Sequence, residues 1–157
     1  MISVEWQIEP AVTALRELQA RLRDLSPAWR SIITHLRRAT LEQFATQGGR
    51  SGQQWQPLTL PYSTQKARRF PGQPILRASD ALFRSLVEQT PDSVVEIAPQ
   101  SLAYGTRRFY GRFHQRGDRP QPKRQFLAII EQDRTQIKKL VRLHLENQAV
   151  LSGFERV

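Results

Sequence analysis

The stretch between residues 104 and 117 concentrates the side chains whose types could carry chemistry. It holds four aromatic residues, three glycines, four arginines and His114 within fourteen positions. As a general base, His114 would need a carboxylate to orient its ring and a reacting group within reach. Asp118 is the nearest acid in sequence, but it is a turn residue beside Gly117. We therefore predict that His114 and Gln115 hydrogen-bond to neighbouring backbone, with a subunit contact as the alternative.

The rest of the chain offers no other catalytic or metal-binding pattern. It has no cysteine, and no two of its three histidines stand four positions apart, which excludes thiolate chemistry and argues against a histidine-based metal site. His35 and His144 fall inside amphipathic segments and are predicted to be surface or boundary residues. The glycines between residues 48 and 52 lack the lysine of a phosphate-binding loop and indicate a helix stop followed by a flexible loop. We expect no catalytic, metal or cofactor-binding residue and no enzyme, with a nuclease based on histidine and arginine as the enzymatic alternative.

The net charge of +10 on 157 residues is the strongest compositional feature, and arginine supplies most of it. Arginine forms paired hydrogen bonds with phosphate and carboxylate groups, so the charge favours a surface that faces nucleic acid or an acidic protein. The alternative is an inert basic surface that keeps the protein soluble. No apolar run approaches the ~20 residues of a membrane span and no signal peptide is recognisable, so we expect a soluble, cytosolically made protein without membrane contact. The candidate electropositive surface comprises Arg68, Arg69, Arg107, Arg108, Arg112, Arg116, Arg119, Lys123 and Arg124.

Hydrophobic periodicity predicts the elements of the first third. Apolar and polar residues alternate over residues 2–8, which predicts a half-buried strand that Pro10 ends. Leucines then recur at three and four positions over residues 11–25, and a second amphipathic segment covers residues 26–44. Ser26 is the predicted N-cap of that second helix. We expect the two helices to form an αα-hairpin or a sharply kinked pair.

The remaining chain alternates between loops and short elements. Residues 48–74 are rich in glycine and proline and predict a long central loop or arm, with a short helix over about residues 62–69. The later expectations are a helix capped by Ser79, a β-hairpin over residues 94–104, a short helix from residue 106 or 107 to Gly117, a third strand or a lead into the last helix at residues 126–130, that helix over 131–147, and a flexible tail over 148–157. Together they predict one α+β domain over residues 1–157, with the N-terminal helix pair and the C-terminal helix packed on a small, mainly antiparallel sheet.

Four motifs follow one another in a distinctive order. They are W-Q-P-L at residues 55–58, I-L-x-x-x-x-x-L-x-x-S at 75–85, Y-G-R-F-H-Q-R-G at 110–117 and R-Q-F-L at 124–127. Their order and spacing resemble the phage virion morphogenesis family, also called tail-completion proteins, of contractile-tailed phages such as Mu. The chain departs from the family pattern at Gly111, where alanine is usual, at Gln125, where proline is usual, and at Asp80, where glycine is common. The resemblance covers about residues 11–145.

The resemblance implies a structural protein of the virion that completes the tail or joins it to the head, as a component of a neck or tail-terminator-like ring. It implies a homo-oligomeric ring, expected as a hexamer, that is made in the host cytoplasm. The implied partners are the tail tube or sheath and head-connector proteins, with non-specific contact to passing DNA. The alternative function is a basic nucleic-acid-binding module without sequence specificity, because no base-reading motif is present.

Two aromatic regions are candidates for subunit contacts. A closed ring needs two different patches that meet between neighbouring copies. The loop around Trp55 either packs onto its own core or reaches a neighbour as an arm, since tryptophan is frequent at binding hot spots. The arginines either line a lumen and face DNA or pair with an acidic ring. The candidate interface comprises Trp55, Pro57, Leu58, Tyr62, Phe109, Tyr110, Phe113 and His114.

Overall fold

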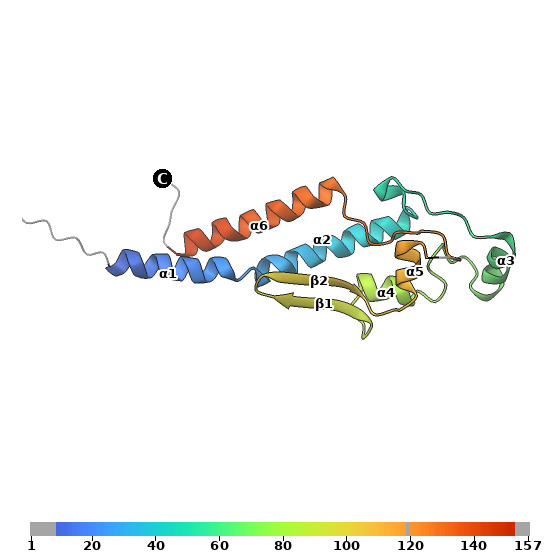
Figure 1. Cartoon of the computed structure of the whole chain (residues 1–157), viewed down its shortest axis with the longest axis horizontal. Coiled ribbons are helices and arrows are strands. Elements are labelled where there is room, and N and C mark those ends of the chain that lie inside the picture. The colour runs from blue at the N-terminus through green and yellow to red at the C-terminus, as the bar shows by residue number, and fades with distance from the viewer. Residues whose placement is uncertain (1–8, 119, 153–157) are drawn as a thin grey trace, which may run out of the picture.

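The computed structural model describes residues 9–118 and 120–152 and confirms the α+β class (Figure 1). The strand expected over residues 2–8 and the end of the expected tail lie outside the described residues. The helices are α1 (Glu9–Arg23), α2 (Ser26–Ala45), α3 (Leu60–Arg69), α4 (Ala81–Val87), α5 (Gly111–Arg116) and α6 (Glu131–Leu151), and the 3-10 turn η1 covers Gly49–Ser51. The strands are β1 (Ser93–Ala98) and β2 (Ser101–Thr106), which pair antiparallel.

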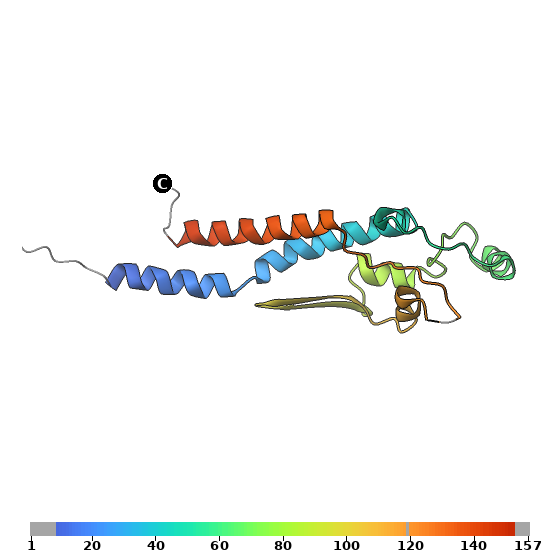
Figure 2. The ribbon, with the colours of Figure 1, turned by 45° about the horizontal axis from the view of Figure 1, so that its top comes forward.

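The molecule is elongated, with α2 as its central rod. Helix α6 runs antiparallel to α2 beside it, α1 continues beyond one end, and α3 stands at the other end (Figures 1 and 2). The two N-terminal helices therefore form a kinked pair. The backbone N–H of Ser26 donates to the Asp24 carboxylate at 2.9 Å, while Ser26 makes no capping bond of its own. The predicted Ser26 cap is therefore not formed: Leu25 occupies the N-cap position, and the Asp24 carboxylate just before it accepts the first N–H of the helix.

The predicted β-hairpin is confirmed, and it packs against α2 and α4. Its turn is formed by residues 99–100, as the proline–glutamine pair indicates. The Tyr104 hydroxyl donates to the Leu86 carbonyl at 2.6 Å, and burial raises the pKa of Tyr104. At the tip, the backbone N–H of Leu25 donates to the carbonyl of Pro99 at 2.8 Å. The hairpin is therefore fixed to α4 near its middle and to the α1–α2 break at its tip.

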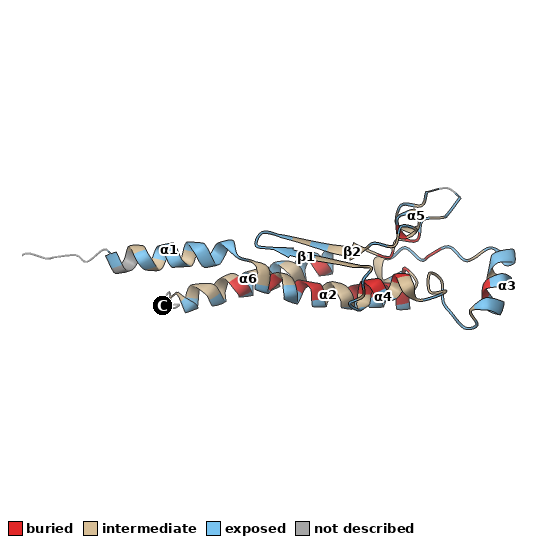
Figure 3. Cartoon of the chain, turned by 90° about the horizontal axis from the view of Figure 1, so that it is seen from below, coloured by how far each residue is buried: buried red, intermediate tan, exposed pale blue. Residues whose placement is uncertain are grey.

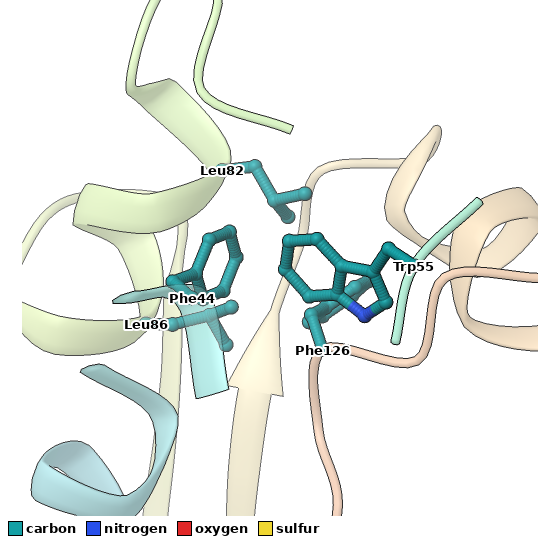
Figure 4. Packing of buried hydrophobic residues seen from close by; sticks show 5 residues of the cluster. All are labelled: Phe44, Trp55, Leu82, Leu86 and Phe126. Atoms are coloured by element: carbon teal, nitrogen blue, oxygen red, sulfur yellow. The ribbon is translucent and has the colours of Figure 1, made fainter. Parts of the chain in front are cut away.

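The core lies where the end of α2 meets α4 and the segment before α6. Its buried apolar side chains are Phe44, Trp55, Leu82, Leu86 and Phe126 (Figure 4). A side chain of this size contributes about 1.5–3 kcal/mol when it is fully buried. Figure 3 shows buried residues along α2 and α4, whereas α1 and α3 are mostly exposed. The two ends of the elongated molecule thus project from a small central core.

Two helix starts differ from the sequence prediction. Helix α4 begins after Asp80 instead of at Ser79, because Asp80 takes a left-handed backbone conformation with φ +58°. The Asp80 carboxylate is held there by Arg77, whose Nε lies 2.7 Å from Oδ1. Helix α5 begins only at Gly111, because Thr106 still belongs to β2. Residues 104–117, where the aromatic residues and arginines are concentrated, therefore comprise the end of β2, a turn and the short helix α5.

Of the two alternatives for residues 126–130, the lead into the last helix is confirmed and the strand is not formed. Helix α6 continues to Leu151, past the predicted end at residue 147. The region predicted as a flexible loop at residues 48–52 is a structured turn. The Gln43 amide donates to the Ser51 hydroxyl at 2.9 Å and accepts the Ser51 backbone N–H at 3.2 Å. None of the described helices is long and apolar enough to cross a membrane.

Candidate assembly surface

A cleft of about 1040 Å³ opens at the end of the molecule that carries α3 and α5. Residues 56–66 line one side, residues 110–124 line another, and residues 76–82 complete it. The candidate interface residues in its lining are Pro57, Leu58, Tyr62, Tyr110 and His114. The two aromatic regions, which the sequence suggested as two patches, therefore form one concave surface of a single chain.

The structure corrects the interface prediction for Trp55. Its side chain is only 4% exposed, and its ring meets Phe44 edge-on with centroids 5.3 Å apart (Figure 4). The indole N–H donates to the carbonyl of Gln125 at 3.1 Å. A ring enclosed by its own chain is not available to a neighbour. Trp55 therefore follows the alternative prediction, in which its loop packs onto the core of the same chain.

Other apolar side chains near the cleft are open to solvent. Leu60 is 83% exposed, Phe109 is 73% exposed and Tyr62 is 48% exposed. Phe113 is half-buried, with the Arg112 guanidinium 4.7 Å above its ring centre. Exposed aromatic and leucine side chains on short helices and turns are typical of surfaces that bind another protein.

Lys66 closes the loop that carries α3. Its ammonium group donates to the carbonyls of Gln73, at 2.6 Å, and Pro74. Burial lowers the pKa of Lys66. This cation therefore fixes the end of α3 to the chain that leads back to α4, and it is not part of the open basic surface.

Arg124 is a second basic residue that is buried and bonded within the chain. The structure therefore corrects the prediction that Arg124 belongs to the electropositive surface. It is only 4% exposed. Its guanidinium donates to the carbonyls of Gln56, at 2.9 Å, and Pro57, at 3.1 Å. Burial lowers the pKa of Arg124. Arg124 thus ties the two long walls of the cleft together.

His114 lines the cleft without a catalytic partner. Burial lowers the pKa of His114, and the charge of Arg124 lowers it further, so the ring is neutral at pH 7. Its Nδ1 atom has no hydrogen-bond partner among the described residues, and no carboxylate orients the ring. No group of three potential metal ligands gathers anywhere in the described part of the chain.

Gln115 makes the backbone contacts that the sequence suggested for this corner. Its side-chain oxygen accepts the backbone N–H groups of Phe126 and Leu127, each at 3.1 Å. Its amide nitrogen donates to the Leu127 carbonyl at 2.7 Å. These three bonds join α5 to the segment that carries the core residue Phe126, so the predicted tie is made through Gln115.

Replacing Gln115 by alanine is expected to lower the free energy of unfolding by about 2–3 kcal/mol, because the backbone N–H groups of Phe126 and Leu127 lose their acceptor. The Leu127 carbonyl keeps the hydrogen bond from the Gln125 amide at 3.1 Å. Urea unfolding followed by circular dichroism measures this loss. The matched control is Gln121→Ala, since the Gln121 side chain is exposed and makes no hydrogen bond among the described residues. Equal stability of the two variants would contradict the role given to Gln115.

The remaining candidate cations differ in how freely they face solvent. Arg107 lies 3.8 Å from Glu96, and Arg108 lies 2.5 Å from Asp92. Arg119 lies outside the described residues. The exposed candidates that form no ion pair within the described ranges are Arg68, Arg69, Arg112, Arg116 and Lys123. These cations stand on α3, on α5 and beside the cleft.

A buried charge cluster joins α2, η1 and α6, and sequence reasoning missed it. Asp133 is 0% exposed and forms an ion pair with Arg50. It also accepts a hydrogen bond from His35 Nε2 at 2.8 Å and from the backbone N–H of Ile130 at 2.9 Å. The Glu42 carboxylate lies 3.1 Å from the other side of the Arg50 guanidinium. The only local signal was an acid in the first turn of a helix, which does not name its partners.

The two histidines predicted as surface or boundary residues also connect helices. His35 is half-buried and contacts Asp133 across 98 positions of sequence. His144 is 9% exposed, and its Nε2 donates to the Asp24 carbonyl at 3.0 Å. Both rings stabilise the packing of α6 against the N-terminal helices, at a distance from the cleft residues.

The family comparison agrees with the motifs that shape this surface. The model of the phage virion morphogenesis family matches residues 6–146. No curated protein and no solved structure is similar enough to this chain to count as a match. The matched span includes the core, the cleft and the buried charge cluster. The chain therefore belongs to the phage virion morphogenesis family, and its role is a structural one in the assembly of the phage particle.

Proposed function

We propose that the protein completes the phage tail or joins it to the head, as one copy in a ring at the head–tail junction. Six copies would match the six-fold axis of a contractile tail. The neighbours of this ring are the tail tube or sheath on one side and the head connector on the other. Family membership supports the virion context, and the shape and charge of the chain support the more specific role.

The observation that carries the proposal is the separation of charge along the molecule. Segments 48–74 and 107–124 hold eleven basic residues and one acid, which accounts for the whole net charge of +10. These two segments supply the long sides of the cleft. An elongated chain with one basic end suits a ring in which every copy presents that end in the same direction, toward DNA or toward an acidic protein ring.

A ring also needs a second patch that differs from the first. The opposite end of the molecule offers α1, whose apolar side is only partly covered. Leu15 is 55% exposed and Leu22 is 38% exposed. In the proposed ring, the end with α1 contacts a neighbouring copy, while the cleft end contacts the adjoining tail or head proteins.

Loss of the gene is expected to leave filled heads and finished-length tails that do not join. Electron microscopy of lysates from a phage with an early stop codon tests this, with a plasmid copy of the gene as the control that restores joined particles. Normal numbers of joined, infectious particles without the protein would overturn the proposed function.

Reversing the free charges at the cleft end is expected to reduce joined particles without unfolding the protein. The test variant is Arg116→Glu with Lys123→Glu, because both side chains are exposed and unpaired within the described ranges. The matched control is Lys138→Glu with Lys139→Glu, two exposed cations on α6. Both variants should keep their stability to within about 0.5 kcal/mol. Particle yield that falls equally for both, or for neither, would contradict a specific role for the basic end.

The same charge separation favours one alternative, a basic module that binds nucleic acid without sequence specificity. It predicts tight binding of the isolated protein to duplex DNA, with an affinity that falls steeply as salt rises. The assembly role predicts weak DNA binding and contacts between proteins. A DNA titration at two salt concentrations, beside light scattering of the protein alone, separates the two functions.

A further inference from the structure

We infer that the cleft binds an acidic segment of a neighbouring virion protein, whose carboxylate groups neutralise Lys66 and Arg124. This inference rests on the proposed function, because it names the chemistry by which the basic end of the chain recognises the adjoining tail or head protein. It adds a buried contact to the exposed charges that the proposed function already uses.

Two buried cations line the cleft from different sides. Lys66 is 6% exposed and Arg124 is 4% exposed, and both belong to the lining. Figure 3 shows α3 as a mostly exposed helix, yet among its described residues Lys66 alone is buried. Arg124 lies in the segment that joins α5 to α6. Lysine and arginine are almost never fully buried unless they are paired, so the charges of this lining need an explanation.

Neither cation has a carboxylate partner among the described residues. Lys66 and Arg124 each donate to two backbone carbonyls, which satisfy N–H groups without neutralising the charge. Asp80 is the only acid among the described lining residues. Both of its oxygens are already held by Arg77, at 2.7 and 3.1 Å. The cleft therefore contains two positive charges that its described residues leave uncompensated.

Burial makes the charged forms of these two side chains unfavourable. It lowers the pKa of Lys66 more than the nearby charge of Asp80 raises it. It also lowers the pKa of Arg124, against a smaller opposing effect of Tyr62. A cation whose pKa falls on folding is less stable in the protein than in water. A carboxylate that enters the cleft reverses this effect and forms charge-assisted hydrogen bonds, which are stronger than those to neutral carbonyls.

The shape of the cleft fits a peptide better than nucleic acid. Its volume of about 1040 Å³ is at the upper end of the roughly 300–1,000 Å³ of small-molecule pockets, so it admits several residues of a chain. A flexible acidic side chain can reach a cation that is recessed in a cleft. The phosphates of a duplex lie on a broad convex surface, and they would meet exposed cations such as Arg116 and Lys123 instead.

The apolar part of the lining indicates what accompanies the acid. Leu58, Leu76 and Leu82 belong to the lining together with several prolines. Tyr62 lines the cleft and is 48% exposed, and Leu60 on the same helix is 83% exposed. Apolar side chains of a partner would cover these surfaces and exclude water from the ion pairs. The expected ligand is therefore an extended segment in which apolar residues flank an aspartate or glutamate.

An array of short overlapping peptides from the tail and head proteins of the same particle tests the inference with the unchanged full-length protein. Each acidic peptide is paired with a copy in which asparagine and glutamine replace aspartate and glutamate. Peptides of this chain itself are included, and the salt concentration is physiological. We expect binding to acidic peptides of another virion protein and its loss in their amide copies. Equal binding of both copies, binding to no acidic peptide, or binding only to peptides of this chain overturns the inference.

Charge removal locates the bound peptide in the cleft. Lys66→Gln removes the buried charge and keeps an N–H donor for the carbonyls, and Arg124→Gln is the second variant of this kind. We expect the affinity for the bound peptide to fall at least about tenfold in each folded variant. The matched control, Lys123→Gln, removes an exposed cation and should lower the affinity by no more than about threefold. Equal losses would show that surface attraction alone holds the peptide, and they would overturn the inference.

Competition with duplex DNA separates the two classes of ligand. We expect the peptide to stay bound at physiological salt, because recessed charge pairs are screened less than exposed ones. Displacement of the peptide by an equal concentration of DNA overturns the inference. If no acidic peptide binds and loss of the gene still leaves unjoined heads and tails, the inference fails and the proposed function stands. Joined particles without the gene would overturn the proposed function, whatever the peptides show.

Discussion

Replacing Asp133 by alanine is expected to lower the free energy of unfolding by about 3–5 kcal/mol, because it removes the buried one of the two carboxylates that pair with the Arg50 guanidinium. Asp133 is fully buried, pairs with Arg50 and receives hydrogen bonds from His35 and Ile130. The loss is a large part of the total of about 5–15 kcal/mol for a typical domain. Urea unfolding measures it, and the melting temperature should fall by about 10 °C or more in a chain of this size.

A double-mutant cycle separates the ion pair from general damage at this site. Arg50→Met, Asp133→Leu and the double variant should show a coupling of more than about 1 kcal/mol, since the two side chains are in direct contact. Glu131→Ala is the matched control, because Glu131 is an exposed acid in the same first turn of α6. A loss for Glu131→Ala equal to that for Asp133→Ala would contradict the importance of the buried cluster.

The same carboxylate should make stability depend on pH in acid. Burial alone would raise the pKa of Asp133, but hydrogen bonds from Arg50, Ile130 and His35 and the charge of Arg50 hold it below its ordinary value. The folded state therefore binds a proton less readily than the unfolded state, and the stabilisation is complete above the unfolded value of about pH 4. It is lost as the pH falls through the lower folded value. Asp133→Asn should flatten this acid dependence, and urea unfolding between neutral and acid pH checks the difference.

The elements that sequence predicted best depend on neighbouring residues. The hairpin follows from alternation around a proline–glutamine turn, and α1 and α2 follow from leucines at three- and four-residue spacing. The first and last residues of the helices are harder to predict, because they depend on single side-chain contacts. Helix α4 starts one residue past Asp80 because Arg77 holds that residue in a left-handed conformation, which no periodicity reveals.

Long-range polar contacts could not be predicted in this way. Asp133 and Arg50 are 83 positions apart, and neither belongs to a pattern that includes the other. Arg124 counted as a surface charge because arginine is rarely buried without a partner. The partners that bury it are two backbone carbonyls, at Gln56 and Pro57, and every residue has such a group. Composition therefore identifies the basic segments, but it does not show which of their cations are buried and bonded within the chain.

Sequence reasoning names candidate residues for the surface, but it does not give the shape of the surface. Aromatic content identified the regions around Tyr62 and Tyr110, but only the fold shows that both line one cleft. The departure from the family's alanine at Gly111 also has a packing reason. A Cβ there would lie 3.3 Å from the side chains of Leu82 and Phe126, which is tighter than ordinary contact. Glycine lets α5 approach the core closely, and this approach sets one wall of the cleft.

Replacing Trp55 by alanine is expected to lower the free energy of unfolding by about 3–5 kcal/mol, through the cavity that a buried ring leaves behind. The ring is 4% exposed and packs against Phe44. Trp55→Phe should lose only about 1 kcal/mol, because it keeps most of the apolar volume. The carbonyl of Gln125 would still accept the amide of Gln43 at 2.8 Å. Denaturant unfolding of Trp55→Ala measures the loss of the buried ring, and that of Trp55→Phe measures mainly the loss of the indole hydrogen bond.

Tyr62→Ala is the control that distinguishes an assembly defect caused by a lost partner contact from one caused by loss of folded protein. Tyr62 is 48% exposed in the cleft, so its loss should change stability by no more than about 0.5 kcal/mol. If Trp55 acts only through the core, its alanine variant should fail in assembly at high temperature and recover on cooling, in step with the folded fraction. A defect from Tyr62→Ala should persist at every temperature, because it removes a contact with the partner. Failure of a stably folded Trp55→Ala protein to assemble would contradict the core assignment and indicate that Trp55 contacts a partner.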